Sequence, residues 1–376
     1  MAFKQVPISE LSPGSFVVQV LQQSGDIAVK HAGWVRTASA VALLQKKGVQ
    51  VVLIDPSKQL AAAISPITDN TEPAIAEAPA DPILFADEMP RAERLIQQSQ
   101  QVQSHVLDAA KHGKMIDLSL VHEVSAGISD SIARNQDVLL FLIRMAEQSD
   151  ALLQHSINCA IYIAAFARHL NLPIDKVQAL ITAALLHDIG KASYAEPLQQ
   201  ADHLTISKTL KLLQKHPHLA GVVSLWIGQH CAHLDGSGHP KMSSLHIDHG
   251  SRMLAIVNNY EKLTSPQQGK FGPLTASRQL LQQSPQQLDS TLLQQFIKCI
   301  GIYPPGSVVK LSSGKLALVL ENNVKKPLLP KVKLFYHSVH QHHIPVKVVD
   351  LAKQQDETIE ACIDLKHYNL DIKNYL

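Results

Sequence analysis

Apolar residues recur at spacings of three and four positions along most of the chain between residues 91 and 300. This period places the apolar side chains on one face of an α-helix. It predicts helices over the ranges 92–111, 119–134, 137–147, 152–170, 176–189, 207–215, 219–229, 252–263 and 293–300. We therefore expect these helices to pack into a bundle around a common apolar core.

The pattern changes at both ends of the chain. Apolar and β-branched runs at 16–21 and 49–54 predict strands, and the range 37–48 between them is typical of a helix that ends at a glycine. Three more strands are predicted at 308–311, 316–320 and 332–336. The expected fold class is mainly α, a helical bundle with a small C-terminal β region, plus a small N-terminal α+β domain.

Composition suggests where the domains end. Residues 61–90 are rich in Ala, Pro and acidic residues, which is typical of an extended linker between an α+β domain at 1–60 and a helical domain at 91–376.

With 34 Lys and Arg against 32 Asp and Glu, the formal charge of +2 argues against a nucleic-acid polymer as partner. No apolar stretch reaches the roughly 20 residues of a membrane helix. The N-terminus does not have the plan of a signal peptide, and the four cysteines form no CxxC pair, so we expect a cytoplasmic protein.

Histidine is unusually frequent, with 20 residues, which directs attention to metal chemistry. His187 and Asp188 end an otherwise apolar helical segment, where burial is costly without a partner such as a divalent cation. Alone, such a pair is more often a helix cap or a hydrogen-bonded pair. However, His155, His216 and His230 lie at the end or face of other predicted helices, which is how a bundle assembles a metal site.

The order of these motifs resembles the HD-GYP phosphodiesterases of bacterial cyclic di-GMP signalling. The resemblance covers about residues 91–336, and residues 11–56 are similar to the small accessory domain that often precedes HD-GYP modules. It implies an HD-type bundle, divalent metal cofactors and a cyclic dinucleotide substrate. The matching segments are, in order, His155, Leu185-Leu186-His187-Asp188-Ile189-Gly190-Lys191, Lys215-His216-Pro217, His230, Asp235-Gly236-Ser237-Gly238-His239-Pro240, Leu263-Thr264-Ser265 and Gly301-Ile302-Tyr303-Pro304-Pro305-Gly306.

The resemblance also implies roles for single residues. Asp188 would bridge two metals, and Lys191 would stabilise phosphate charge. Lys270 could also reach a phosphate. The turn Gly236-Ser237-Gly238 would approach the substrate, although an ordinary turn between helices is the alternative. The implied ligands are His155, His187, Asp188 and the position of Asn258 for the first metal, and Asp188, His216, His230 and the position of Cys231 for the second.

Several positions depart from the family pattern. Asn258 stands where the family has an aspartate, so the first metal loses an anionic ligand. Cys231 replaces a histidine; its thiolate is a competent ligand for zinc or iron, but a small buried apolar residue is an equal alternative. Gln267 replaces an arginine, and His239 replaces the tyrosine. We therefore expect one divalent ion (iron, manganese or zinc) rather than two.

Two functions follow from these expectations. The first is a metal-dependent phosphodiesterase acting on cyclic di-GMP whose activity is weak or lost. The second is a non-catalytic module in bacterial signalling that binds a cyclic dinucleotide or a protein partner, and helices over 92–134 could mediate a homodimer. The histidine-rich tract 337–343 resembles a metal-binding tract, but its position after a strand and away from the helical ligands favours a solvated loop.

Overall fold

The computed structural model divides into two compact units, Met1–Glu72 and Pro73–Leu376. It describes residues 3–12, 15–24, 33–35, 41, 44–46, 48–55, 83–146, 150–196, 201–216, 219, 221–265, 271–354, 356–363, 368 and 370–375. Most of the expected helix at 37–48 and most of the expected linker at 61–90 lie outside these residues.

The N-terminal unit is built on an antiparallel sheet with strand order β1-β4-β2-β3. Its strands are β1 (Lys4–Pro7), β2 (Ser15–Gln23), β3 (Gly33–Val35) and β4 (Val49–Ile54). Val52 is fully buried, and Val6, Val17 and Val49 pack in the same small core. The β-branched run Val49-Gln50-Val51-Val52-Leu53-Ile54 predicted this strand, and the structure places β4 over the same residues. β1 and β3 are short and were not predicted.

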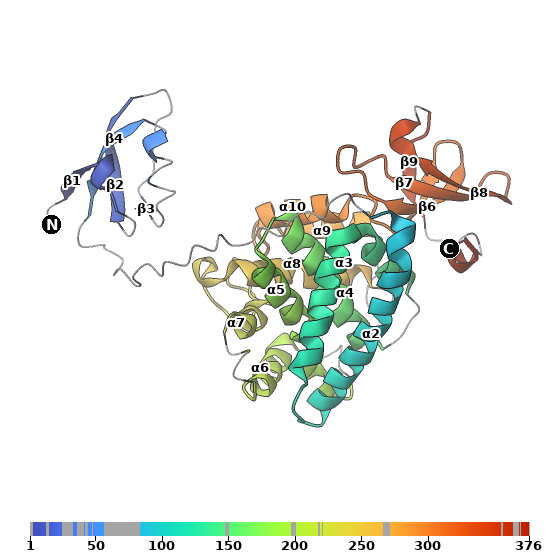
Figure 1. Ribbon diagram of the computed structural model, residues 1–376, viewed down its shortest axis with the longest axis horizontal. Helices are drawn as coiled ribbons and strands as arrows, with labels where there is room; N and C mark the ends of the chain where they lie inside the picture. Colours follow the sequence, from blue (N-terminus) through green and yellow to red (C-terminus); the bar gives the residue numbers. More distant parts are fainter. Residues whose placement is uncertain are drawn as a thin grey trace. The chain divides into compact units, whose positions relative to one another are not determined.

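The second unit is a helical bundle (Figure 1). Its central helix is α4, in which every residue from Leu152 to Ala167 is buried. A helix that is buried on every side lies inside the protein, and its few buried polar residues, such as His155 and Asn158, need partners there. Asp150 caps its start by accepting hydrogen bonds from the amides of Leu152 and Leu153. The helices of this unit are α2 (Phe85–Lys111), α3 (Leu118–Met145), α4 (Ala151–His169), α5 (Ile174–Leu186), α6 (Asp202–Leu213), α7 (Val222–Gln229), α8 (His249–Thr264), α9 (Pro273–Gln283) and α10 (Ser290–Ile300).

Two helices differ from their predicted bounds in informative ways. α2 begins at Phe85, seven residues before the predicted start, and so includes Pro90, whose missing amide hydrogen removes one intrahelical hydrogen bond. The predicted helices at 119–134 and 137–147 are continuous in α3, which bends at Asn135, whose φ of −159° and ψ of 101° are not helical. α9 was not predicted, because its exposed face is polar and glutamine-rich.

The segment after α5 is held tightly against α6. Ile189–Ser193 forms a short 3-10 helix in which the Gly190 amide donates to Thr209 Oγ1 at 3.0 Å. A Cβ at Gly190 would lie 2.5 Å from the Thr205 carbonyl oxygen, so only glycine allows this approach. This packing fixes the chain immediately after His187 and Asp188.

The C-terminal part is an antiparallel sheet with strand order β8-β7-β6-β5-β9 (Figure 1). Phe141 of α3 packs on this sheet in a cluster with Leu316, Leu318 and Phe335. The strands are β5 (Val308–Leu311), β6 (Lys315–Glu321), β7 (Lys331–His337), β8 (His342–Asp350) and β9 (Ile359–Cys362). The prediction of a loop over 337–343 was wrong in part, since the tract contains the end of β7 and the start of β8.

The mainly α fold with a small C-terminal β region and a small N-terminal strand domain is confirmed. Among the described residues, no helix combines the length and the apolar composition needed to span a membrane.

Candidate metal centre

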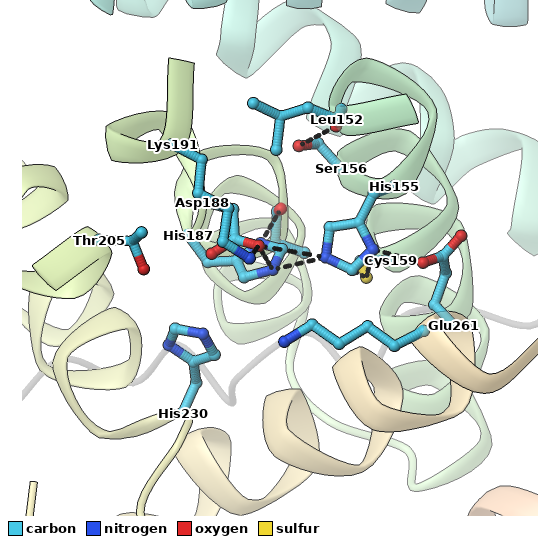
Figure 2. Close-up of polar contacts among 12 residues, drawn as sticks. Leu152, His155, Ser156, Cys159, His187, Asp188, Lys191, Thr205, His230 and Glu261 are labelled. Atoms are coloured by element: carbon cyan, nitrogen blue, oxygen red, sulfur yellow. Dashed lines mark hydrogen bonds and ion pairs between the residues drawn. The ribbon is translucent and has the colours of Figure 1, made fainter. Parts of the chain in front are cut away.

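Three helices bring their ends or faces to one buried point (Figure 2). His155 is the fifth residue of α4. His187 and Asp188 directly follow α5, and His230 directly follows α7. All four side chains are essentially inaccessible to solvent. Polar side chains this deeply buried require partners.

The distances among these side chains are short. His155 Nε2 lies 3.1 Å from His187 Nε2 and 3.4 Å from Asp188 Oδ2, and His187 Nε2 lies 3.5 Å from the same carboxylate oxygen. The ring of His230 stands edge-on to that of His187, with 5.0 Å between centroids. His187, Asp188 and His230 form a group whose possible ligand atoms lie within 4.8 Å of one another.

Backbone carbonyls set the orientation of two of the rings. His187 Nδ1 donates to the Ala184 carbonyl and His230 Nδ1 donates to the Ile227 carbonyl, both at 2.7 Å. With the proton on Nδ1, a neutral ring presents the lone pair of Nε2. Burial and the neighbouring histidines keep the pKa of His187 well below its usual range, and burial lowers the pKa of His230. Both rings are therefore neutral, as metal ligation requires.

Asp188 is ionised in this setting. Burial disfavours its charge, but the Lys191 ammonium and the hydrogen bond with His155 outweigh burial and hold the pKa of the Asp188 carboxyl well below its usual range. The buried Lys191 ammonium lies 2.5 Å from Asp188 Oδ2. Burial lowers the pKa of His155, but Cys159, Glu261 and Asp188 raise it well above its usual range, so this ring must lose a proton when a metal binds. The site places the Asp188 carboxylate beside the neutral imidazoles of His187 and His230, a donor set that suits a divalent transition metal.

Glu261 of α8 is a site residue that the sequence did not single out. Its buried carboxylate forms an ion pair with His155 Nδ1 and accepts a hydrogen bond from Asn158 Nδ2 at 3.0 Å. Burial raises the pKa of the Glu261 carboxyl, but His155 and Asn158 lower it by more than burial raises it. The net pKa is therefore below its usual value, and the carboxylate is charged. A carboxylate behind a histidine fixes the ring and leaves Nε2 toward the metal side.

Asn258 lies one helical turn before Glu261 and is also buried. Its side-chain oxygen has no hydrogen-bond partner among the described residues. An orphaned buried oxygen of this kind is uncommon and favours an additional partner.

Cys159 joins the site from α4, one turn after His155. Its sulfur lies 3.8 Å from His155 Nε2, and His155, Cys159 and His187 form a second fully buried group of possible ligands within 4.8 Å. Burial raises the pKa of the Cys159 thiol. The spacing of four residues from His155 places both side chains on one helix face and could have identified Cys159 from the sequence.

The structure does not bring His216 and Cys231 into these two groups within the described residues. His216 Nε2 accepts a hydrogen bond from the Ile116 amide at 3.3 Å, so this ring nitrogen is engaged at the loop between α2 and α3. Burial raises the pKa of the Cys231 thiol to about 12, and its carbonyl accepts a hydrogen bond from the His239 amide. The ligand roles of His216 and Cys231 stay predictions.

The remaining predicted residues lie near the surface or outside the described chain. Asp235 Oδ1 accepts a hydrogen bond from the Ser237 amide at 2.9 Å, and Gly236 has a φ of +79°, so the Gly236-Ser237-Gly238 segment is a tight turn. Gly238 allows this turn to fold back on the residue after His230, since a Cβ there would lie 2.3 Å from the Cys231 carbonyl oxygen. Lys270 and Gln267 lie outside the described residues.

Lys262 is a further cation that the sequence did not indicate. Its ammonium lies 3.8 Å from Asp202 Oδ1, and its side chain is partly exposed. Burial opposes its charge, but the carboxylates of Asp188 and Asp202 raise the pKa of Lys262. Lys262 therefore adds positive charge at the edge of the buried cluster.

Comparison with known proteins agrees with this geometry. Residues 141–292 match the family described as HD domain, and residues 3–121 match a domain of unknown function, DUF3391. The cyclic di-GMP phosphodiesterase PA4108 of Pseudomonas aeruginosa is 28% identical, with 93% of this chain and 89% of that protein aligned. The 3'3'-cGAMP-specific phosphodiesterase 1 of Vibrio cholerae is 30% identical over an alignment that covers 34% of this chain and 33% of the length of that protein.

A solved structure is also similar. Bd1817, an HDG"Y"P protein from Bdellovibrio bacteriovorus, aligns with a TM-score of 0.47 at 15% identity, covering 78% of this chain and 98% of that one. The two family matches and the alignment along nearly the whole Pseudomonas relative agree with the ordered motifs of the sequence. The chain therefore carries an HD domain over residues 141–292, preceded along the sequence by a DUF3391 match over residues 3–121.

Proposed function

We propose that this protein is a divalent-metal-dependent phosphodiesterase of cyclic dinucleotides, with cyclic di-GMP as the first candidate substrate, and that its turnover is slow. The observation that carries the proposal is the buried convergence of His155, His187, Asp188 and His230. The names of the two relatives, one a cyclic di-GMP phosphodiesterase and the other a 3'3'-cGAMP-specific phosphodiesterase, support the substrate class.

The residues of the cluster fit a metal ion of the iron, manganese or zinc class. We expect His155, His187, Asp188 and His230 to hold one ion, with Glu261 orienting His155 from behind. When bound, such an ion would polarise a phosphoryl oxygen and acidify a water molecule. Asp188 supplies the negative charge that draws the cation, and the buried helices exclude bulk water from these polar groups.

Charge is the reason to expect slow turnover. Of the two groups of possible ligands, one includes a carboxylate, that of Asp188, and the other includes none, while Asn258 offers only a neutral oxygen. A neutral amide is a weaker ligand than a carboxylate for a hard dication. We propose that the Cys159 thiolate restores part of the missing charge when metal binds, because a metal ion displaces the proton of a coordinating thiol.

The phosphodiester is an anion and needs cationic contacts. We propose Lys191 and Lys262 for this role, since one lies beside Asp188 and the other lies at the partly exposed edge of the site. Lys270 and the turn Gly236-Ser237-Gly238 remain proposed substrate contacts. A lysine ammonium binds phosphate as a point charge, so it replaces only in part the bidentate contact of the arginine absent at Gln267.

The second candidate function is a non-catalytic module that binds a cyclic dinucleotide. The observation that favours it is the neutral amide of Asn258, which is a weaker metal ligand than a carboxylate. If the ion is held too weakly for hydrolysis, the cationic edge could still bind the nucleotide. The two candidates differ in one measurable property, because only the first predicts metal-dependent release of a linear dinucleotide.

The test is restoration of the missing ligands. We expect wild-type protein to retain about one ion per chain after gel filtration and to hydrolyse cyclic di-GMP slowly. The double variant Asn258→Asp with Cys231→His should retain more metal and turn over faster, and Asp188→Asn should abolish both. Fast hydrolysis with two bound ions in the wild type would refute the proposed loss of activity. Nucleotide binding without hydrolysis in every variant would favour the non-catalytic module.

A further inference from the structure

A second histidine cluster lies in the C-terminal sheet, in the hairpin formed by β7 and β8. His337 ends β7, His342 begins β8, and the sheet register pairs them directly. Residues that face each other across an antiparallel pair lie on the same side of the sheet. His340 lies in the turn between them. Three imidazoles that are separated in the sequence by only a few residues thus share one side of the hairpin.

The spacing of the three rings suits a shared metal ion. The ring centroids lie 4.5 Å apart for His337 and His340, 5.7 Å for His337 and His342, and 6.0 Å for His340 and His342. With Zn–N bonds of about 2.0–2.1 Å, two imidazoles on one tetrahedral zinc have their ring centres about 5 Å apart. In the described part of the chain these three rings do not form a group whose possible ligand atoms all lie within 4.8 Å of one another, so rotation of the rings about their Cβ–Cγ bonds is needed to aim three nitrogens at one ion.

The hairpin backbone holds these residues in place. The Ser338 amide and hydroxyl both donate to the Gly314 carbonyl, at 2.8 Å and 2.6 Å, so the turn of this hairpin is fixed to the turn between β5 and β6. A Cβ at Gly314 would lie 3.3 Å from His337 Cε1, which shows that the His337 ring covers this glycine. His342 Nδ1 lies 3.4 Å from the His340 carbonyl and donates to it, leaving Nε2 as a free acceptor.

One long contact engages a ring nitrogen of the three, since the His340 amide donates to His337 Nδ1 at 3.5 Å, and a rotation of the His337 ring would release it. Lys315 pairs with His337 in the sheet, but its ammonium is already 3.0 Å from Glu357 Oε1. His343 belongs to the other side of the hairpin, where its Nδ1 forms a hydrogen bond of 2.6 Å with the Tyr375 hydroxyl. The cluster is therefore His337, His340 and His342.

We propose that His337, His340 and His342 form a second metal site, separate from the bundle site, that binds a transition-metal dication of the zinc and nickel class. Three neutral imidazoles favour such ions over magnesium or calcium, which prefer oxygen ligands. The fourth position of a tetrahedral ion would be open to water. A bound ion would cross-link the β7–β8 turn and so stabilise the hairpin.

The test is a zinc titration of the full chain in competition with a chromophoric chelator. Wild-type protein should take up one zinc equivalent more than the double variant His340→Ala with His342→Ala. The matched control, His105→Ala with His122→Ala, removes two exposed histidines from α2 and α3 and should keep the wild-type uptake. Both sets of side chains are exposed, so the fold should be retained.

His337→Gln provides an independent variant, and it should lose the same equivalent. Zinc should also raise the melting temperature of an Asp188→Asn protein, whose bundle site is impaired, and this increase should vanish when the hairpin variant is added. Equal zinc uptake by wild type and by both hairpin variants would overturn the proposal. Because the bundle residues are unchanged in the hairpin variants, that result would leave the proposed phosphodiesterase function untouched.

Discussion

Replacing Glu261 by glutamine tests how the bundle site is held. The carboxylate is buried, pairs with His155 Nδ1 and accepts from Asn158 Nδ2. A glutamine of the same shape can accept one of these hydrogen bonds but presents an NH2 group to the other donor. His155 can then avoid two facing donors by moving its proton from Nδ1 to Nε2, which removes the lone pair intended for the metal.

The magnitude follows from the role of an outer carboxylate. Loss of such a partner typically weakens metal affinity about 10–100-fold, equivalent to about 1.4–2.7 kcal/mol. Leaving a buried donor unsatisfied should lower the free energy of unfolding by about 1–3 kcal/mol. Glu261 has a lowered pKa, so its contribution is present at neutral pH and is lost as the pH falls below about 4.5 toward the folded-state pKa.

The assay is metal competition with a chelator, together with urea unfolding of the metal-free protein at pH 7.5 and pH 3.5. Glu123→Gln, on the exposed side of α3, is the matched control and should change neither quantity. The Glu261→Gln deficit in unfolding free energy should shrink at the lower pH. Unchanged metal affinity in Glu261→Gln would refute the reasoning that this carboxylate orients His155.

Three further predictions concern other residues. Cys159→Ser should lower the retained metal more than Cys231→Ser, because only Cys159 lies within the ligand groups; equal losses would reject this ranking. Gly190→Ala should destabilise the protein by about 1–3 kcal/mol in urea unfolding, since the added methyl meets Thr205 and Thr209. Burial raises the pKa of Asp137 to about 7, so its charging costs stability as the pH rises from about 4 to 7. Asp137→Asn should therefore match wild type in thermal unfolding near pH 4 and exceed it at pH 8, by at most about 4 kcal/mol; a difference independent of pH would contradict this.

The sequence predicted the helical bundle well because its buried faces are strongly periodic. α4 and α5 carry long apolar runs at helical spacing, and β5 begins and ends where expected. α9 and β8 were missed for the opposite reason. α9 exposes glutamines, and β8 is largely exposed and contains Pro345, so neither shows a clear apolar pattern.

The candidate site could be predicted only in part. His155, His187, Asp188 and His230 were selected by their order along the chain, and the structure places them together. Glu261 was missed because a single glutamate on a helix is usually exposed, although its spacing of three from Asn258 puts both on one face. The direction of the His216 ring, toward the Ile116 amide, depends on tertiary packing that local sequence does not contain.

The central claim is that the buried cluster holds a divalent ion and hydrolyses a cyclic dinucleotide slowly. The most direct measurement is chromatographic detection of linear dinucleotide from cyclic di-GMP, using metal-loaded wild type and metal-loaded Asp188→Asn. The account predicts slow release by wild type, loss of that release after chelation, and none from Asp188→Asn. Release that persists undiminished in Asp188→Asn would contradict the account, because the reaction would then not depend on this site.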